Sequence, residues 1–260
     1  GEFVMGDING WADEQTQTRL AIAKPFWMGK LEITNQQFAK FNPRHDSGYI
    51  SVYKKDHGVR GLPVCDPTQP VVRVSWTQAR EFCRWLSGRA GAKFDLPTEA
   101  QWEYACRAGT ATAMNYGDVT SDFRGLANFA DRSVNRISRG GPEWIPNIPG
   151  VDDGAAVTTT GGRYAPNAWG LLDMHGNVAE WTRSNYRPYP YNANDGREDV
   201  NDDGRKVVRG GSFYDRPKAG RSGFRLDYPS WQRVYNVGFR VICEPGPAGV
   251  AKLAAAQDKK

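Results

Sequence analysis

The stretch NAWGLLDMHGNVAEW, from Asn167 to Trp181, is the part of the sequence that decides the fold. From Trp169 onward its short apolar runs are separated by glycine and asparagine, a pattern typical of strand, turn and strand. KVVRGGSF, residues 206–213, has the same character. Residues 110–205 are otherwise crowded with Gly, Asn, Asp and Pro. The sequence therefore predicts a C-terminal half with short strands and much irregular structure.

Three helices are predicted before this region. TNQQFAKF, SWTQAREFCRWLSG and TEAQWEYACRAG each open with Ser or Thr followed three residues later by Gln, which is the pattern of a capping box. Gly88 and Gly109 are predicted to end the second and third helices. VYNVGFRVICEP, residues 234–245, is predicted to be one final strand. Together these elements predict a single α+β domain over residues 1–245 and a flexible tail over 246–260.

The composition supports a loop-rich domain. Hydrophobic residues make up 39% and aromatic residues 12% of the chain, so aromatic clusters rather than long helices are expected to hold the core. The net charge of +5 is scattered and forms no basic tract, which argues against a nucleic-acid partner. No apolar run approaches the ~20 residues of a membrane span, so no transmembrane segment is predicted.

The cysteines are Cys65, Cys83, Cys106 and Cys243, and no two have the CxxC spacing. This argues against a zinc site or a thioredoxin-type redox motif. Cys83 falls on the apolar face of the second helix and is predicted to be a small buried hydrophobic residue.

Four motifs occur in order: LPTEAQWEYACRAG, NAWGLLDMHGNVAEW, VVRGGSF and NVGFRV. Together they resemble the formylglycine-generating enzyme family, also called the sulfatase-modifying-factor domain. The resemblance covers nearly the whole chain, from Gly1 to about Cys243. It implies a single compact fold related to C-type lectins and low in regular secondary structure.

In the enzymes of that family, two cysteines after the RGGS turn bind copper and use oxygen to convert a substrate cysteine to formylglycine. The matching positions here are Asp215 and Gly220, and Ala179 stands where the enzymes have a Trp; Ser212 is retained. Copper(I) prefers soft sulfur ligands, so no copper is expected. The leading hypothesis is a non-catalytic domain that binds a peptide, protein or other ligand in the former substrate groove. The alternative is an oxidoreductase of the same family with a non-thiol mechanism.

The candidate groove follows the RGGS turn and is rich in arginine. Arginine presents a planar fork of donors to carboxylate, phosphate or peptide groups, and Tyr and Trp add rigid contact area. The alternative is that some of the arginines stabilise the fold through internal ion pairs. The predicted groove residues are Ser212, Tyr214, Asp215, Arg216, Arg221 and Arg225, with Arg209, Trp231 and Tyr235 nearby.

The resemblance also implies two structural calcium sites, built from carboxylate and carbonyl oxygens as calcium prefers. The alternative for the acidic residues is that they cap turns and pair with arginines. The first predicted set is Asn128, the Phe129 carbonyl, Asp153 and the Ala155 carbonyl. The second is Asp173, the carbonyls of Gly176 and Val178, and Glu180.

Other candidate metal ligands are weaker. DVNDDG, residues 199–204, matches the first half of an EF-hand loop, but Lys206 and Gly210 break the rest, which favours an Asx-rich turn. His45 and His57 lie in polar loops where hydrogen bonding is the usual role. Neither these two nor His175 is predicted to bind a metal.

Whether Cys106 and Cys243 form a disulfide is left open. Family members pair a cysteine at the position of Cys106 with one directly after the GFR motif, but Cys243 comes three residues after Arg240. That shift moves it ~7 Å along the strand, more than a disulfide absorbs without movement of the helix end. A bridge would indicate an oxidising, periplasmic or extracellular location. The chain shows no signal peptide, but it begins in what looks like a strand, so a segment cut from its start is also considered.

Overall fold

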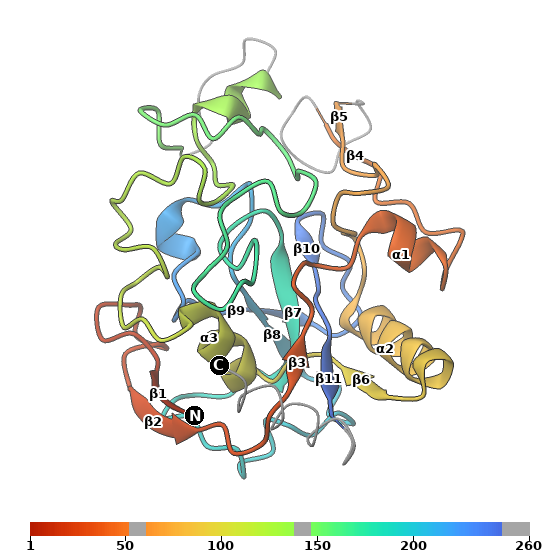
Figure 1. Cartoon of the computed structure of the whole chain (residues 1–260), viewed down its shortest axis with the longest axis vertical. Helices are drawn as coiled ribbons and strands as arrows, with labels where there is room; N and C mark the ends of the chain where they lie inside the picture. The colour runs from red at the N-terminus through yellow and green to blue at the C-terminus, as the bar shows by residue number, and fades with distance from the viewer. Residues whose placement is uncertain (52–60, 138–146, 246–260) are drawn as a thin grey trace, which may run out of the picture.

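A four-stranded sheet lies at the centre of the described part of the chain. The computed structural model describes residues 1–51, 61–137 and 147–245. The strand order is β10-β7-β8-β9, antiparallel except for the parallel pair β10 and β7. In Figure 1 the helices α2 and α3 lie on opposite sides of β7. The strands are β7 (Ala179–Asn185), β8 (Arg205–Arg209), β9 (Leu226–Pro229) and β10 (Val237–Gly238).

Alternation along β7 explains why helices pack on both of its faces. Successive side chains of a strand point to opposite faces. Ala179 and Trp181 share one hydrophobic cluster with Phe82 and other residues of α2 (Trp76–Ala90). Glu180 points to the other face, where it accepts a hydrogen bond from Trp102 of α3 (Glu99–Arg107) at 2.8 Å.

All three predicted helices are present, and each begins with its capping box: Thr34 and Gln37 on α1 (Asn35–Ala39), Ser75 and Gln78 on α2, Thr98 and Gln101 on α3. The predicted end of α2 at Gly88 is wrong. The helix continues to Ala90, and Gly91 ends it in the left-handed region with φ of 64°, where glycine has no steric cost.

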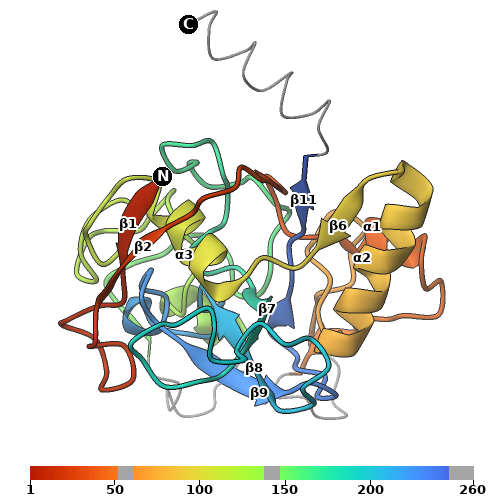
Figure 2. The same cartoon turned by 90° about the horizontal axis from the view of Figure 1, so that it is seen from below.

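The predicted final strand is divided. Its first part is β10, while β11 (Ile242–Glu244) belongs to another sheet between β3 (Trp27–Met28) and β6 (Lys93–Asp95). Arg240, between the two parts, is fully buried. Figure 2 shows β11 and β6 side by side. The remaining elements are β1 (Glu2–Met5), β2 (Thr18–Ala21), β4 (Tyr49–Ile50), β5 (Leu62–Pro63), η1 (Arg132–Arg136) and η2 (Pro217–Ala219). The α+β prediction is confirmed.

All four cysteines are free thiols, so the possible bridge between Cys106 and Cys243 is absent. Cys106 is buried, with its sulfur 3.5 Å from His175 Nε2 and 3.6 Å from Ser222 Oγ. Cys243 lies on β11 opposite Trp27 and Phe94. The pair therefore gives no support for an oxidising location. Cys83 is buried in the core as predicted.

Within the described residues, no helix is both long enough and apolar enough to cross a bilayer. The predicted tail over 246–260 lies outside the described residues.

Candidate functional site

The loop after β8 begins with two glycines that the local packing requires. Gly210 and Gly211 both have positive φ, of 91° and 65°. A Cβ on Gly211 would lie 2.7 Å from the Ala219 carbonyl oxygen. The RGGS turn therefore packs directly against the far end of its own loop. This packing fixes the position of Ser212, which is fully buried.

Ser212 is the centre of a small polar network. Its Oγ donates to Asp215 Oδ2 at 2.6 Å and accepts from Asn236 Nδ2 at 2.8 Å. Burial raises the pKa of Asp215. The Asn236 Oδ1 atom is buried without a hydrogen-bond partner in the described residues. The Asp215 carboxylate is thus directed inward onto the serine.

The second position at which the resemblance places a cysteine has no room for a side chain. A Cβ on Gly220 would lie 2.2 Å from the Phe129 ring, closer than real contacts allow. The Gly220 carbonyl accepts a hydrogen bond from His175 Nδ1 at 2.7 Å, and His175 Nε2 accepts from the Asn115 N–H at 3.0 Å. Burial lowers the pKa of His175 to about 4, so this histidine is neutral and holds the loop in place.

Ala179, where the family's enzymes have a Trp, is buried on β7 and is 3% exposed. It pairs with Val237 of β10, so its small side chain belongs to the core between β7 and α2.

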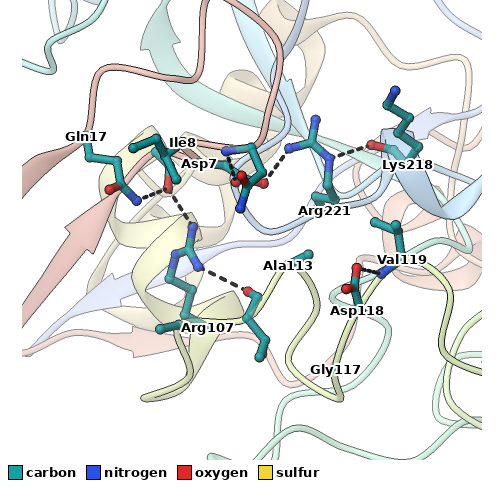
Figure 3. Close-up of a pocket in the computed structure, with 14 residues that line it drawn as sticks. Asp7, Ile8, Gln17, Arg107, Ala113, Gly117, Asp118, Val119, Lys218 and Arg221 are labelled. Atoms are coloured by element: carbon teal, nitrogen blue, oxygen red, sulfur yellow. Dashed lines mark hydrogen bonds and ion pairs between the residues drawn. The ribbon is translucent and has the colours of Figure 1, made fainter.

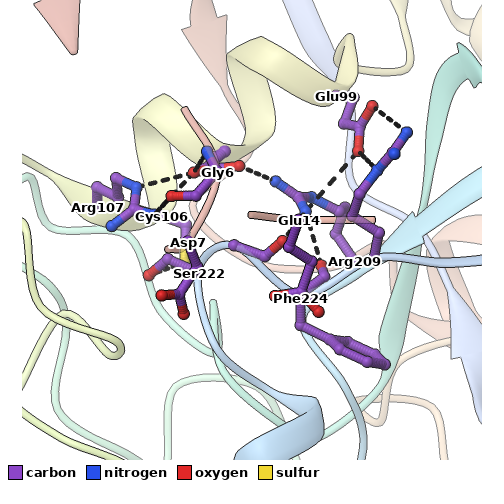
Figure 4. Close-up of polar contacts among 12 residues, drawn as sticks. Gly6, Asp7, Glu14, Glu99, Cys106, Arg107, Arg209, Ser222 and Phe224 are labelled. Atoms are coloured by element: carbon purple, nitrogen blue, oxygen red, sulfur yellow. Dashed lines mark hydrogen bonds and ion pairs between the residues drawn. The ribbon is translucent and has the colours of Figure 1, made fainter. Parts of the chain in front are cut away.

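Three of the four loop arginines are internal. Arg209 pairs with Glu103 and donates to the carbonyls of Gly223 and Phe224. Figure 4 shows this network beside α3. The guanidinium of Arg209 is fully buried. Arg209 therefore stabilises the fold through an internal ion pair, which was the alternative to a role in ligand binding.

Arg221 and Arg225 are also inside the fold, which corrects their prediction as groove residues. Arg225 Nε donates to Glu99 Oε1 at 2.6 Å, and its guanidinium lies 4.1 Å from the Tyr189 ring centroid. Arg221 pairs with Glu14 at 2.7 Å and with Asp7. Sequence reasoning could not separate these from a ligand-facing arginine, because the acidic partners lie far away in the chain.

Two of the predicted groove residues, Tyr214 and Arg216, are accessible. Arg216 is exposed, and Tyr214 is half-buried. The Tyr214 ring packs edge-on against Tyr235, with 5.5 Å between the centroids. Trp231 is 73% exposed. Tyr214 and Arg216 are therefore loop residues that a ligand can reach, and Trp231 is exposed after β9.

A cavity of about 540 Å³ adjoins the far end of the loop, between the N-terminal segment around Asp7 and residues 111–119. Figure 3 shows Arg107, Arg221 and Lys218 on its wall. Arg107 donates to the Gly6 carbonyl at 2.9 Å and pairs with Glu103. Both buried guanidiniums therefore already have protein partners, and Lys218 is the exposed cation.

The first predicted calcium set is largely satisfied by the protein. Both oxygens of Asp153 accept backbone N–H groups, from Phe129 at 2.9 Å and Ala155 at 2.8 Å. The Ala155 carbonyl accepts from Ser133 Oγ. Asn128 Oδ1 is buried without a hydrogen-bond partner in the described residues. Burial raises the pKa of Asp153 to about 7. Both Asp153 oxygens and the Ala155 carbonyl of this set therefore already have protein donors.

Glu180, in the second set, forms a buried ion pair with Arg240. Both its oxygens accept from Arg240, at 2.6 to 2.9 Å, and one also accepts from Trp102. The alternative interpretation, pairing with an arginine, describes Glu180 correctly. Its carboxylate has little capacity left for a calcium ion.

Asp173 has a different acidic neighbour, which sequence reasoning missed. Asp173 Oδ1 and Glu32 Oε2 are both buried without hydrogen-bond partners in the described residues. Burial raises the pKa of both carboxyls, and repulsion from Asp173 adds to the rise for Glu32. Asn177 Nδ2 donates to the other oxygen of Glu32 at 3.1 Å, across 145 positions of sequence. No local pattern could reveal such a pairing.

The described residues contain no group of three or more His, Cys, Asp or Glu side chains suited to a metal ion. A cation at Glu32 and Asp173 would depend on carbonyl oxygens, for which Gly176 and Val178 are the predicted donors.

The remaining candidates have structural roles. Residues 199–204 form Asx turns, since Asp199 accepts from the Asn201 N–H and Asp202 from the Gly204 N–H. His45 Nε2 lies 2.9 Å from the Val72 carbonyl. The prediction for His57 lies outside the described residues.

Comparison with known proteins agrees with this geometry. The family model of the Sulfatase-modifying factor enzyme 1-like domain matches residues 1–245. The chain belongs to this family. It is 30% identical to the formylglycine-generating enzyme of Streptomyces coelicolor over 257 residues, which cover 82% of this chain and 76% of that protein.

Two further relatives are informative. The chain is 31% identical over 151 residues to the inactive C-alpha-formylglycine-generating enzyme 2 of Bos taurus, and the match covers 56% of this chain and 39% of that protein. PvdO from Pseudomonas aeruginosa has a similar fold, with a TM-score of 0.71 and 23% identity over 94% of this chain and 92% of that one. The structural likeness supports the fold alone.

Proposed function

We propose that this family member binds a peptide, protein or other ligand at the surface around Tyr214 and Arg216 and does not generate formylglycine. The observation that carries the proposal is the state of the two positions at which the enzymes have cysteines. Asp215 is turned onto Ser212 Oγ at 2.6 Å, and the space beside Gly220 is filled by the Phe129 ring. Neither position offers the soft sulfur that copper(I) prefers.

The cysteines that are present do not compensate. Burial raises the pKa of Cys106 to about 12 and that of Cys83 further still, so both are protonated thiols at neutral pH. The thiolate is the form that binds metals. Cys65 is exposed, and Cys243 lies on β11. The relative named inactive supports the proposal as a precedent for such a member of the family.

Formylglycine formation is the direct test. The protein is incubated with copper, a reductant, oxygen and a peptide carrying a sulfatase-type cysteine motif, and the peptide is analysed by mass spectrometry. The expected result is no product above the no-enzyme control. Turnover above that control would overturn the proposal.

Structural calcium is part of the same proposal, with Glu32 and Asp173 as its carboxylate ligands. Two buried carboxylates, each with one unpartnered oxygen, are unfavourable side by side, and the nearby Arg240 offsets this only in part because it is paired with Glu180. A bound divalent cation would relieve both the repulsion and the desolvation. Gly176 and Val178 would supply carbonyl oxygens, and Glu180 would stay with Arg240.

Refolding in the presence and absence of calcium tests this assignment. An ion held at about a hundred times its Kd stabilises the native state by about 2.7 kcal/mol. For a chain of this length that corresponds to a rise in Tm of about 5–10 °C. Glu32→Gln and Asp173→Asn should abolish the rise, while Glu81→Gln, an exposed control on α2, should retain it. Equal Tm values for the wild-type protein refolded with calcium and with chelator would exclude the site.

A further inference from the structure

A cavity of about 650 Å³ is not used by any role described above. It lies between the loop that follows α1, the beginning of α2 and the loop before β10. Its lining includes Arg44, His45 and Asp46 from the first, Gln78 from the second and Arg233 from the third, together with Arg73 from the segment just before α2.

The lining of this cavity carries an excess of positive charge. It contains three arginines and one carboxylate, that of Asp46. Arg44 and Arg233 are exposed, and neither lies within ion-pair distance of a carboxylate in the described part of the chain. The buried arginines beside the 540 Å³ cavity, by contrast, pair with Glu103 and Glu14. The guanidiniums of Arg44 and Arg233 therefore keep hydrogen-bond donors for an external anion. We call this cavity of about 650 Å³ the basic cavity.

The wall behind these side chains is held firmly. Arg73 Nη2 donates to the Tyr49 carbonyl at 2.9 Å, and the Arg73 backbone N–H donates to the Val234 carbonyl at 3.0 Å. Arg73 has a φ of 56°. This region is sterically unfavourable for a non-glycine residue, so the surrounding contacts must impose this conformation.

His45 adds to the wall without adding charge. Burial lowers its pKa, against the effect of its hydrogen bond to the Val72 carbonyl, and the nearby Arg233 and Arg73 lower it further while Asp46 raises it. The neutral ring packs edge-on against Phe38 at 4.9 Å between centroids.

The basic cavity is connected to the candidate ligand surface by a short piece of chain. Tyr235 lies two residues after Arg233, and its ring packs on Tyr214. The next residue, Asn236, donates through its side-chain amide to Ser212 Oγ. Trp231, two residues before Arg233, is 73% exposed. Only two positions of chain thus separate Arg233 from the ring that packs on Tyr214.

We infer that the basic cavity binds a side-chain carboxylate of an acidic peptide, with Arg44 and Arg233 as the donors. The inference rests on the proposed ligand-binding function and specifies its ligand. Arginine forks match carboxylate geometry. Asp46 on the lining disfavours a phosphate dianion more than a singly charged carboxylate. The exposed Trp231 and the Tyr214–Tyr235 pair offer the contact area that a peptide, rather than a free anion, would use.

The test uses a fluorescein-labelled, N-acetylated hexapeptide of alternating Gly and Glu and its Gln counterpart, with binding followed by fluorescence anisotropy on the full chain. The Glu peptide should bind about tenfold more tightly than the Gln peptide, since each hydrogen bond to a charged group contributes about 1.5–3 kcal/mol. Arg44→Gln combined with Arg233→Gln should remove this preference. Arg84→Gln, an exposed arginine on α2 that does not line the cavity, should preserve it.

Equal binding of the two peptides, or an unchanged preference in the double variant, would overturn the inference. Tighter binding of inorganic phosphate, measured by displacement of the Glu peptide, would overturn the choice of a carboxylate. Each of these failures leaves the proposed loss of the family's chemistry unaffected, because that loss is tested by formylglycine formation and not by peptide binding.

Discussion

At the scale of single residues, the contact between Gly220 and Phe129 supports the proposal that this chain lacks copper–thiolate chemistry. The Phe129 ring packs edge-on against Phe123, with 5.6 Å between centroids, and is fully buried. A side chain at position 220 would have to displace this ring. The absence of a cysteine here is therefore built into the packing around the loop as well as into the sequence.

Gly220→Ala should destabilise the protein by about 1–3 kcal/mol, the usual cost of overpacking a core. Urea denaturation measures the change. Gly150→Ala, at a glycine whose Cβ would meet no atom within 4 Å, is the matched control and should change stability little. Combining Gly220→Ala with Phe129→Leu should cost less than the sum of the two single changes. Strict additivity would show that the ring is not the obstacle.

The ion pair between Glu180 and Arg240 predicts a second stability effect. Removing one partner of a buried pair costs about 3–5 kcal/mol, because the other charge is left uncompensated. Glu180→Gln should therefore lower stability by this amount both with calcium and with chelator. A loss seen only in the presence of calcium would identify Glu180 as a calcium ligand instead.

At the scale of secondary structure, helix starts were predictable and helix ends less so. A capping box is a local contact over four residues, and all three predicted boxes are formed. The end of α2 could not be read from the first available glycine. Gly88 faces open space and adopts helical geometry, whereas Gly91 adopts the left-handed conformation.

These two glycines should respond oppositely to alanine. Gly88→Ala should stabilise the protein by about 0.5–1 kcal/mol, because alanine is the better helix former. Gly91→Ala should destabilise it by about 1 kcal/mol, because the φ of 64° disfavours a Cβ. Thermal denaturation followed by circular dichroism measures both. The same sign for both variants would contradict the helix boundary.

The candidate site was only partly predictable for a related reason. The ordered motifs identified the family and the RGGS turn. They could not show that Arg225 meets Glu99 across 126 positions or that Glu32 lies beside Asp173. The final apolar stretch was predicted as one strand because alternation does not reveal that β10 and β11 join different sheets.

At the scale of the whole molecule, buried ion pairs join segments far apart in the chain. Arg221 ties the loop after β8 to Glu14 near the N-terminus, and Arg209 ties β8 to Glu103 of α3. Figure 4 shows Glu14, Glu99 and Arg209 among the polar contacts beside α3. These ion pairs hold the loop after β8 against α3 and the N-terminal segment, as the proposed ligand-binding surface requires.

The central claim, that the family's copper site has been lost, is tested most directly by titration with copper(I). The protein, kept reduced and free of oxygen, is titrated against the bicinchoninate complex of copper(I), and the absorbance of that complex is followed. The account predicts that the protein removes no copper from the chelator. Withdrawal of one equivalent that persists in the Cys65→Ser variant would contradict it.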